Sequence, residues 1–114
     1  MGAQDHLRIE VAHDDDRVVL SLHGELDMAS APLLQRAIED VELARKPMVV
    51  LDLQRLEFID STGLRIILSA RKRCGERDQQ LAVTRGSPQV ERLLSVTGMA
   101  EHLHTVPATD ELGA

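Results

Sequence analysis

A strand-like apolar run that passes directly into a helix-like segment constrains the fold more than any other part of the chain. Residues 48–53 read MVVLDL, nearly all apolar and rich in β-branched side chains, which is typical of a strand covered on both faces. After a short junction, the apolar side chains of residues 64–73 recur at the three- and four-residue spacing of a helix. We therefore predict a buried strand, a tight junction and a helix, in that order.

The junction, residues 57–64, reads EFIDSTGL. Asp60 and Ser61 are both favourable helix N-caps, and Gly63 removes a Cβ from the first turn. A hydroxyl at a helix N-terminus lies beside unpaired backbone N–H groups and the positive end of the helix dipole, where a phosphate is stabilised. Capping explains Asp60 or Ser61 alone, but it does not explain why both occur together with Thr62 and Gly63.

The rest of the chain alternates strand and helix signals. Strands are predicted at residues 7–11, 17–23, 81–84 and 102–106. Helices are predicted to begin at Ser30-Ala31-Pro32, where the Ser30 hydroxyl is the expected cap, and at Ser87-Pro88. Turns or ends of elements are predicted at Gly24 to Asp27, at residues 75–79 and at Gly98. One domain is predicted to cover residues 1–114, with its core at about 7–106 and a tail at 107–114.

The order of these signals, β-β-α-β-α-β-α-β, predicts an α/β fold. We expect a mixed, mostly parallel sheet of about five strands, with right-handed crossovers and an antiparallel hairpin at the start of the chain. Folds of this kind place their sites in the loops at the carboxyl ends of the parallel strands. Residues 58–63 lie at such an end, and Asp27 is expected on the same side of the sheet.

Composition excludes several classes of function. Phe58 is the only Phe, Tyr or Trp, so single-stranded nucleic acid, which stacks on aromatic side chains, is disfavoured as a partner. The net charge of −6 opposes attraction to nucleic-acid backbones and anionic lipids. No apolar run approaches the roughly 20 residues of a membrane span, and the N-terminus lacks a signal-peptide core. We predict a cytoplasmic protein that binds neither nucleic acid nor membrane.

Metal and cofactor chemistry finds no support in the sequence. The single cysteine, Cys74, excludes an internal disulfide and an all-cysteine metal site. The five histidines are scattered, and no carboxylate or cysteine pattern accompanies the closest two, His102 and His104. The basic run at residues 71–73 is interpreted as a solvated helix end, where cations complement the dipole. We predict no metal site and no cofactor.

Three segments carry a family resemblance: GELD at residues 24–27, DSTGL at residues 60–64, and the stretch from Ser87-Pro88 to Thr97-Gly98. Together they resemble the STAS family, and most closely the bacterial anti-sigma factor antagonists. The similarity extends from about Leu7 to Val106, and only the tail looks short for the last helix of the family. The resemblance implies a single STAS-like domain.

The resemblance also implies that the protein switches partners through phosphorylation. In this family the unphosphorylated antagonist binds an anti-sigma factor that is also a serine kinase, and the sigma factor is released. The kinase phosphorylates the serine of the DSTG motif, here Ser61 (less favourably Thr62), and a metal-dependent serine phosphatase reverses this. By resemblance, the partner-binding residues are Asp27, Asp60, Ser61, Thr62 and Gly63.

Other functions compete with this interpretation. A STAS module can also be a scaffold or a transport-complex subunit that is never phosphorylated. A phosphorelay receiver domain has a similar size and alternating architecture, with an aspartate in its central strand as at Asp52. No helix fits between the first two strands, however, and no lysine follows the last strand, which opposes a receiver. Because no nucleophile–base pair or glycine-rich phosphate loop is present, we predict no enzymatic activity.

Overall fold

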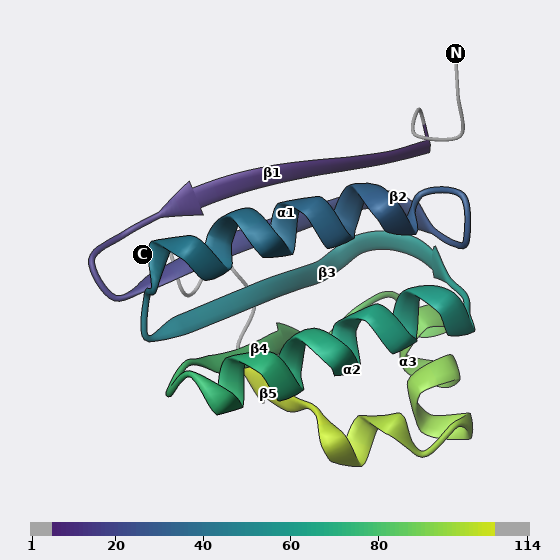
Figure 1. Ribbon diagram of the computed structural model, residues 1–114. Coiled ribbons are helices and arrows are strands. Elements are labelled where there is room, and N and C mark those ends of the chain that lie inside the picture. The colour runs from purple at the N-terminus through teal and green to yellow at the C-terminus, as the bar shows by residue number, and fades with distance from the viewer. Residues whose placement is uncertain (1–5, 107–114) are drawn as a thin grey trace.

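Strands that follow one another in sequence lie side by side in the sheet. The computed structural model describes residues 6–106 and arranges five strands in the order β1-β2-β3-β4-β5 (Figure 1). The elements are β1 (Leu7–His13), β2 (Arg17–Leu26), α1 (Ala31–Ala44), β3 (Met48–Ile59), α2 (Ser61–Glu76), β4 (Gln80–Thr84), α3 (Pro88–Val96), the 3₁₀ helix η2 (Met99–His102) and β5 (His104–Val106). β1 is antiparallel to β2, and all other neighbours are parallel. The predicted α/β fold with a mixed, mostly parallel sheet is confirmed.

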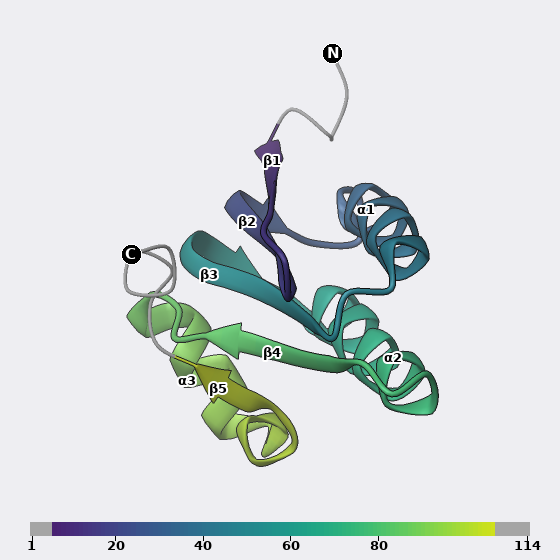
Figure 2. The same ribbon diagram turned by 90° about the vertical axis from the view of Figure 1, so that its left-hand side faces the viewer.

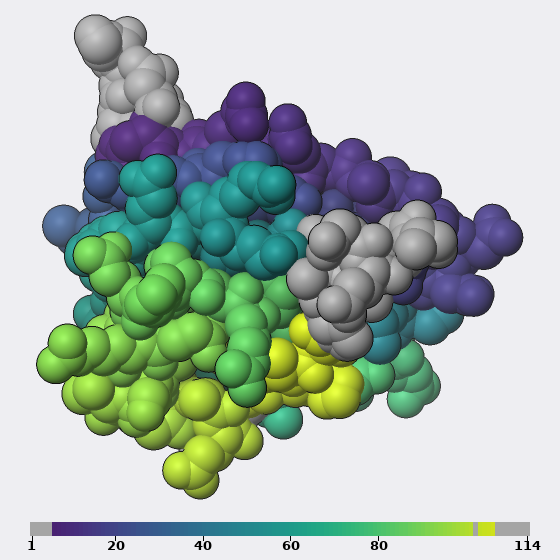
Figure 3. Space-filling model, turned by 180° about the vertical axis from the view of Figure 1, so that it is seen from behind, coloured from purple at the N-terminus to yellow at the C-terminus, as the bar shows by residue number. Residues whose placement is uncertain are grey.

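The helices lie on both sides of the sheet. α1 and α2 cover one face, whereas α3 lies on the other side, near β4 and β5 (Figure 2). Seen from behind, the yellow-green surface of α3 borders the teal surface of β3 (Figure 3). Because β2, β3 and β4 run parallel, their carboxyl ends meet at one edge, on the right in Figure 1. None of the described helices is long and apolar enough to cross a membrane.

The core is aliphatic, as the near absence of aromatic residues requires. Its main cluster combines the sheet with all three α-helices and includes Leu20, Leu34, Leu51, Ile67 and Leu94. β3 is buried on both faces, because Leu51 belongs to this cluster while Val50 and Asp52 alternate with it and are also buried. The central apolar run therefore has the two-sided burial that its composition predicted.

Asp52 is buried in β3 and is bonded to both neighbouring strands. Its Oδ1 accepts the hydroxyl of Thr84 (3.1 Å), and its Oδ2 accepts the hydroxyl of Ser21 (3.4 Å). Asp52 thus joins strands instead of standing at a loop, as a phosphorelay acceptor would. The strand order β1-β2-β3-β4-β5 differs from the order 2-1-3-4-5 of receiver domains. Receiver sheets are also fully parallel, whereas β1 and β2 here form an antiparallel hairpin. The receiver alternative is wrong.

Both strands that lead to the site are longer than predicted. β2 does not end at Gly24 but continues to Leu26, because it stays paired with β3 up to Ile59. The chain passes Gly24 with a φ of +107°, and a Cβ there would lie 2.1 Å from the carbonyl oxygen of His6. β3 in turn continues to Ile59, because the side chains of Leu56 and Ile59 are buried in the core.

The C-terminal elements differ in their boundaries as well. α2 includes Gly75 and ends at Glu76, where a turn was predicted, because Cys74 is buried in the core and holds the last turn. β5 begins at His104, since a short 3₁₀ helix occupies the preceding residues. The helices predicted from Ser30-Ala31-Pro32 and Ser87-Pro88 are confirmed. The predicted tail at 107–114 lies outside the described residues.

The basic run at residues 71–73 is only partly solvated. Nε of Arg73 lies 2.9 Å from Oε2 of Glu42, a buried carboxylate on α1. Nη1 of Arg77 lies 3.6 Å from the other oxygen of the same carboxylate. Removing the cations would leave a buried charge uncompensated, so this contact ties α1 to α2. The interpretation of the run as a solvated helix end is therefore wrong for Arg73.

Candidate functional site

The GELD and DSTG segments meet at the carboxyl edge of the sheet. The backbone N–H of Asp60 donates to the carbonyl of Leu26 (3.1 Å), which joins the end of β2 to the start of α2. The parallel register places Leu26 beside Ile59, the last residue of β3. All five residues predicted to bind a partner therefore lie at this one edge.

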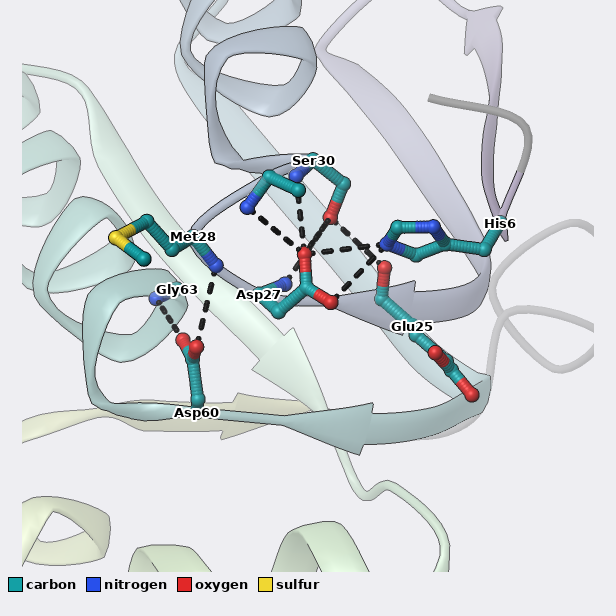
Figure 4. Close-up of polar contacts among 8 residues, drawn as sticks. His6, Glu25, Asp27, Met28, Ser30, Asp60 and Gly63 are labelled. Carbon is teal, nitrogen blue, oxygen red and sulfur yellow. Dashed lines mark hydrogen bonds and ion pairs between the residues drawn. The ribbon is translucent and has the colours of Figure 1, made fainter. Parts of the chain in front are cut away.

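Asp60 connects two loops at this edge. Its Oδ1 accepts the N–H of Gly63 (3.0 Å), and its Oδ2 accepts the N–H of Met28 (3.1 Å; Figure 4). The first contact makes Asp60 the N-cap of α2. Ser61, the other predicted cap, is instead the first residue of the helix. One carboxylate thus fixes both the start of α2 and the β2–α1 loop.

Ser61 presents an accessible hydroxyl. Its side chain is exposed, and its hydroxyl forms no hydrogen bond with the residues that the structure describes. Thr62, by contrast, is half-buried. The first turn of α2 contains no acidic residue, and its unpaired N–H groups favour negative charge. A phosphate on Ser61 would therefore be tolerated by the helix.

Gly63 allows α2 to begin directly against the sheet. A Cβ at this position would lie 2.6 Å from Cγ of Leu26 and 3.2 Å from Cγ1 of Ile59. Both neighbours are core residues at the ends of their strands. The absence of a side chain at Gly63 thus sets how closely the Ser61 turn packs on β2 and β3.

Asp27 organises the β2–α1 loop. Its Oδ1 accepts the N–H groups of Ala29 and Ser30 (3.0 Å each), and Nε2 of His6 lies 3.1 Å from both carboxylate oxygens. The hydrogen bond from His6, followed by that from the backbone of Ser30, holds the pKa of Asp27 below its ordinary value. Asp27 is therefore an ionised anchor for the loop that carries Met28.

Ser30 does not cap α1 with its side chain, contrary to the prediction. Its backbone has φ −95° and ψ −11°, whereas a capping residue needs an extended conformation to turn its hydroxyl toward the helix. The hydroxyl instead donates to the carbonyl of Glu25 (2.9 Å) and accepts the N–H of Asp27 (3.0 Å). Ser30 therefore closes the loop rather than the helix end.

Two exposed apolar residues at the same edge were missed in the sequence. The side chain of Met28 is 74% exposed, and that of Phe58 is 47% exposed. Phe58 lines a groove of about 420 Å³ with Leu93 and Val96 of α3. A contiguous exposed apolar patch rimmed by polar side chains is typical of a protein-binding surface. The available signal was that the only Phe, Tyr or Trp of the chain lies two residues before the DSTG segment.

Replacing Asp60 with alanine is expected to destabilise the chain by about 1–3 kcal/mol. Loss of an N-cap costs about 0.5–2 kcal/mol, and the N–H of Met28 loses a charged acceptor as well. The measurement is urea-induced unfolding at neutral pH.

Asp15→Ala is the matched control for Asp60→Ala. Asp15 is exposed in the β1–β2 turn, so its replacement is expected to change the free energy of unfolding by no more than about 0.5 kcal/mol. An equally small change for Asp60→Ala would contradict the bridging role of Asp60.

The chain is similar to a known family along most of its length. The STAS domain family matches residues 8–112. Over 87 residues the chain is 34% identical to the anti-sigma-F factor antagonist RsfB of Mycobacterium tuberculosis, and the alignment covers 76% of this chain and 71% of RsfB.

Solved structures give the same answer for the fold. An anti-sigma factor antagonist from Mycobacterium paratuberculosis superposes with a TM-score of 0.84 at 31% identity, covering 97% of this chain and 94% of that one. The Bacillus cell fate determinant SpoIIAA, in its phosphorylated form, superposes with a TM-score of 0.71 over 93% of this chain and 96% of that one. At 19% identity the second likeness supports the fold alone.

Proposed function

Because this chain belongs to the STAS domain family, we propose that it is an anti-sigma factor antagonist that acts by partner switching. Unphosphorylated, it binds an anti-sigma factor that is also a serine kinase, and a sigma factor is released in the cytoplasm. The kinase phosphorylates Ser61, and the phosphorylated chain no longer binds the anti-sigma factor. A metal-dependent serine phosphatase removes the phosphate and so restores this binding. RsfB and the M. paratuberculosis protein, both named anti-sigma factor antagonists, support the antagonist role. The protein is thus a binding module, not an enzyme.

The observation that carries the proposal is the free hydroxyl of Ser61 at a helix start that is already capped. Asp60 supplies the capping oxygen, so the serine hydroxyl has no structural task among the described residues. It is exposed at the edge where α/β folds place their sites. A kinase can therefore reach and modify it without unfolding the helix.

The surface around Ser61 supports contact with a protein partner. Met28 and Phe58 are large, apolar and exposed at the same edge. Asp60 fixes the loop of Met28 relative to α2, so the surface is held in place before a partner arrives. Pre-organised surfaces bind more tightly, because less conformational entropy is lost on association.

Phosphorylation would act through charge rather than through unfolding. A phosphate adds about −1.5 to −2 charges at neutral pH. The helix N-terminus stabilises that charge, so α2 keeps its structure. Asp60 lies next to Ser61, so the edge becomes strongly acidic at one point. A partner that fits the unmodified edge would then meet an unpaired charge, which costs several kcal/mol in an interface.

Ser61→Asp is expected to bind the anti-sigma kinase at least about tenfold more weakly than the unmodified chain, a loss near 1.4 kcal/mol. A carboxylate at the first helical position suits the dipole, so stability should rise by about 0.3 kcal/mol or more. In the interface the same carboxylate is buried without a partner, which is unfavourable. Isothermal titration against the kinase measures the affinity, and circular dichroism checks that the helix content is unchanged.

Ser69→Asp is the matched control, since Ser69 is exposed on α2 but lies two turns from the edge. It should bind like the unmodified chain, and so should Ser61→Ala. If Ser61→Asp binds as tightly as the unmodified chain, Ser61 lies outside the interface. The alternative of a STAS scaffold that is never phosphorylated would then replace partner switching.

A further inference from the structure

A second group of polar side chains lies beside the β2–α1 loop. His6, Glu25 and Asp27 each offer one potential ligand atom, and the three atoms lie within 4.8 Å of one another. His6 precedes β1, Glu25 is the last residue but one of β2, and Asp27 follows that strand (Figure 4). The group combines an imidazole with two carboxylates, which is a richer donor set than acidic side chains alone.

The β1–β2 hairpin brings these residues together. Leu7 pairs with Gly24, so the residue before Leu7, His6, lies opposite Glu25. Asp27 follows directly after the end of β2, two positions beyond Glu25, and the ligand atoms of the two residues and of His6 lie within 4.8 Å of one another. A Cβ at Gly24 would lie 2.1 Å from the carbonyl oxygen of His6, so the close approach of the two strands depends on glycine.

Contrary to the expectation from the sequence that the chain has no metal site, we propose that His6, Glu25 and Asp27 form a binding site for one divalent transition-metal ion such as Zn²⁺. Imidazole nitrogen and carboxylate oxygen are ordinary ligands of this ion, at about 2.0–2.2 Å. Two ligand atoms on one such ion are therefore about 3–3.5 Å apart. Nε2 of His6 lies 3.1 Å from each oxygen of Asp27, a hydrogen-bond distance that is also close to the spacing of two ligands on one ion. The three potential ligand atoms lie within 4.8 Å of one another, so the side chains would have to draw closer around an ion.

The ligands are also oriented for this role. The N–H groups of Ala29 and Ser30 hold the carboxylate of Asp27 toward His6, as second hydrogen-bond partners do in known metal sites. The carboxylate of Glu25 is exposed and forms no hydrogen bond or ion pair with the described residues. It can therefore rotate onto an ion without breaking an existing contact.

Metal binding would replace the contact between His6 and Asp27. Without metal, the imidazole and the carboxylate are in direct contact; with metal, the ion would lie between them, and any proton on the ligating nitrogen would be released. Three protein ligands leave at least one coordination position for water.

An ion at this site would tie the start of β1 to the loop that carries Met28. The N–H of Met28 binds Asp60, so the ion would lie one residue from the contact that holds α2 and the loop together. The ion would also neutralise the carboxylates of Glu25 and Asp27, close to the edge that carries Asp60 and Ser61. Zinc binding at this cluster requires neither Ser61 nor a kinase, so either property can be present without the other.

Titration of the full chain, stripped with EDTA and desalted, with ZnCl₂ tests the site. We expect one ion per chain, and an affinity that falls at least about tenfold in His6→Asn and in Glu25→Gln, since even loss of an indirect partner of a metal site costs 10–100-fold. Zn²⁺ should also raise the melting temperature of the unmodified chain more than that of Glu25→Gln. Mg²⁺, which prefers oxygen ligands and keeps several waters, should not compete at equal concentration.

His13→Asn and Glu57→Gln are the matched controls, because both residues are exposed away from the cluster: His13 at the far end of β1 and Glu57 in β3. They should bind Zn²⁺ like the unmodified chain. The site is disproved if the unmodified chain shows no saturable binding at Zn²⁺ concentrations up to about 1 mM. It is equally disproved if His6→Asn and Glu25→Gln bind like the controls, or if Mg²⁺ competes as well as Zn²⁺.

Discussion

Ser61→Ala is expected to take up no phosphate when the full chain is incubated with its genomically neighbouring serine kinase and ATP. The hydroxyl of Ser61 is exposed and has no hydrogen-bond partner among the described residues, whereas Thr62 is half-buried in the same turn. Thr62→Val removes the second hydroxyl without changing the volume much, so it should be labelled like the unmodified chain. Mass-spectrometric mapping of the phosphorylated residue provides the measurement.

Loss of labelling in Ser61→Ala has to be separated from loss of the fold. Asp60 caps α2, so Ser61→Ala is expected to change the free energy of unfolding by no more than about 0.5 kcal/mol. It should also keep its affinity for the kinase. Labelling that persists in Ser61→Ala and disappears in Thr62→Val would assign the acceptor to Thr62 instead.

Gly63→Ala is expected to destabilise the chain by about 1–3 kcal/mol, the usual penalty for an extra methyl group in a packed core. Its Cβ would lie 2.6 Å from Cγ and 2.8 Å from Cδ2 of Leu26, closer than real Cβ contacts. Leu26 is fully buried at the end of β2, so it cannot turn away into solvent. The start of α2 must move outward, which also disturbs the edge that carries Ser61. Urea-induced unfolding and kinase affinity measure the two effects.

Gly75→Ala is the opposite case on the same helix. Gly75 lies in the last turn of α2 and is exposed, and a Cβ there would meet no atom within 4 Å beyond its chain neighbours and the backbone of its own helix. Alanine there should stabilise the chain by about 0.5–1 kcal/mol, because glycine loses more backbone entropy in a helix. If Gly63→Ala were as favourable as Gly75→Ala, the close packing of the Ser61 turn on β2 would not be required.

The layout of the fold could be predicted because hydrophobic pattern and turn residues agreed along the chain. The apolar run at the start of β3 and the Ser87-Pro88 start of α3 are local signals, and both held. The ends of β2 and β3 could not be placed, because they depend on the pairing of Leu26 with Ile59 across the sheet. No local pattern encodes that register.

The candidate site was predicted in its residues but not in their contacts. Asp60 and Ser61 were equal as caps in the sequence, and only the approach of Met28 shows why the aspartate takes that position. The contact of His6 with Asp27 depends on the register of the β1–β2 hairpin. The two residues are far apart in the sequence, so no local pattern predicted this contact. Partner-binding and phosphorylation of these residues stay predictions.

The sequential order of the strands has a consequence for how the chain is made. Each strand pairs with the strand synthesised just before it, so β2 can pair with β1, and β3 with β2, while later residues are still inside the ribosome. Closing the β1–β2 hairpin costs little loop entropy, whereas the parallel pairing of β3 with β2 must first close a longer loop through α1, so it is the slower step. The bond between Asp60 and Met28 becomes possible once α2 starts to emerge, well before α3 and β5 are available. Folding on the ribosome should therefore complete the Ser61 edge before the sheet itself is finished.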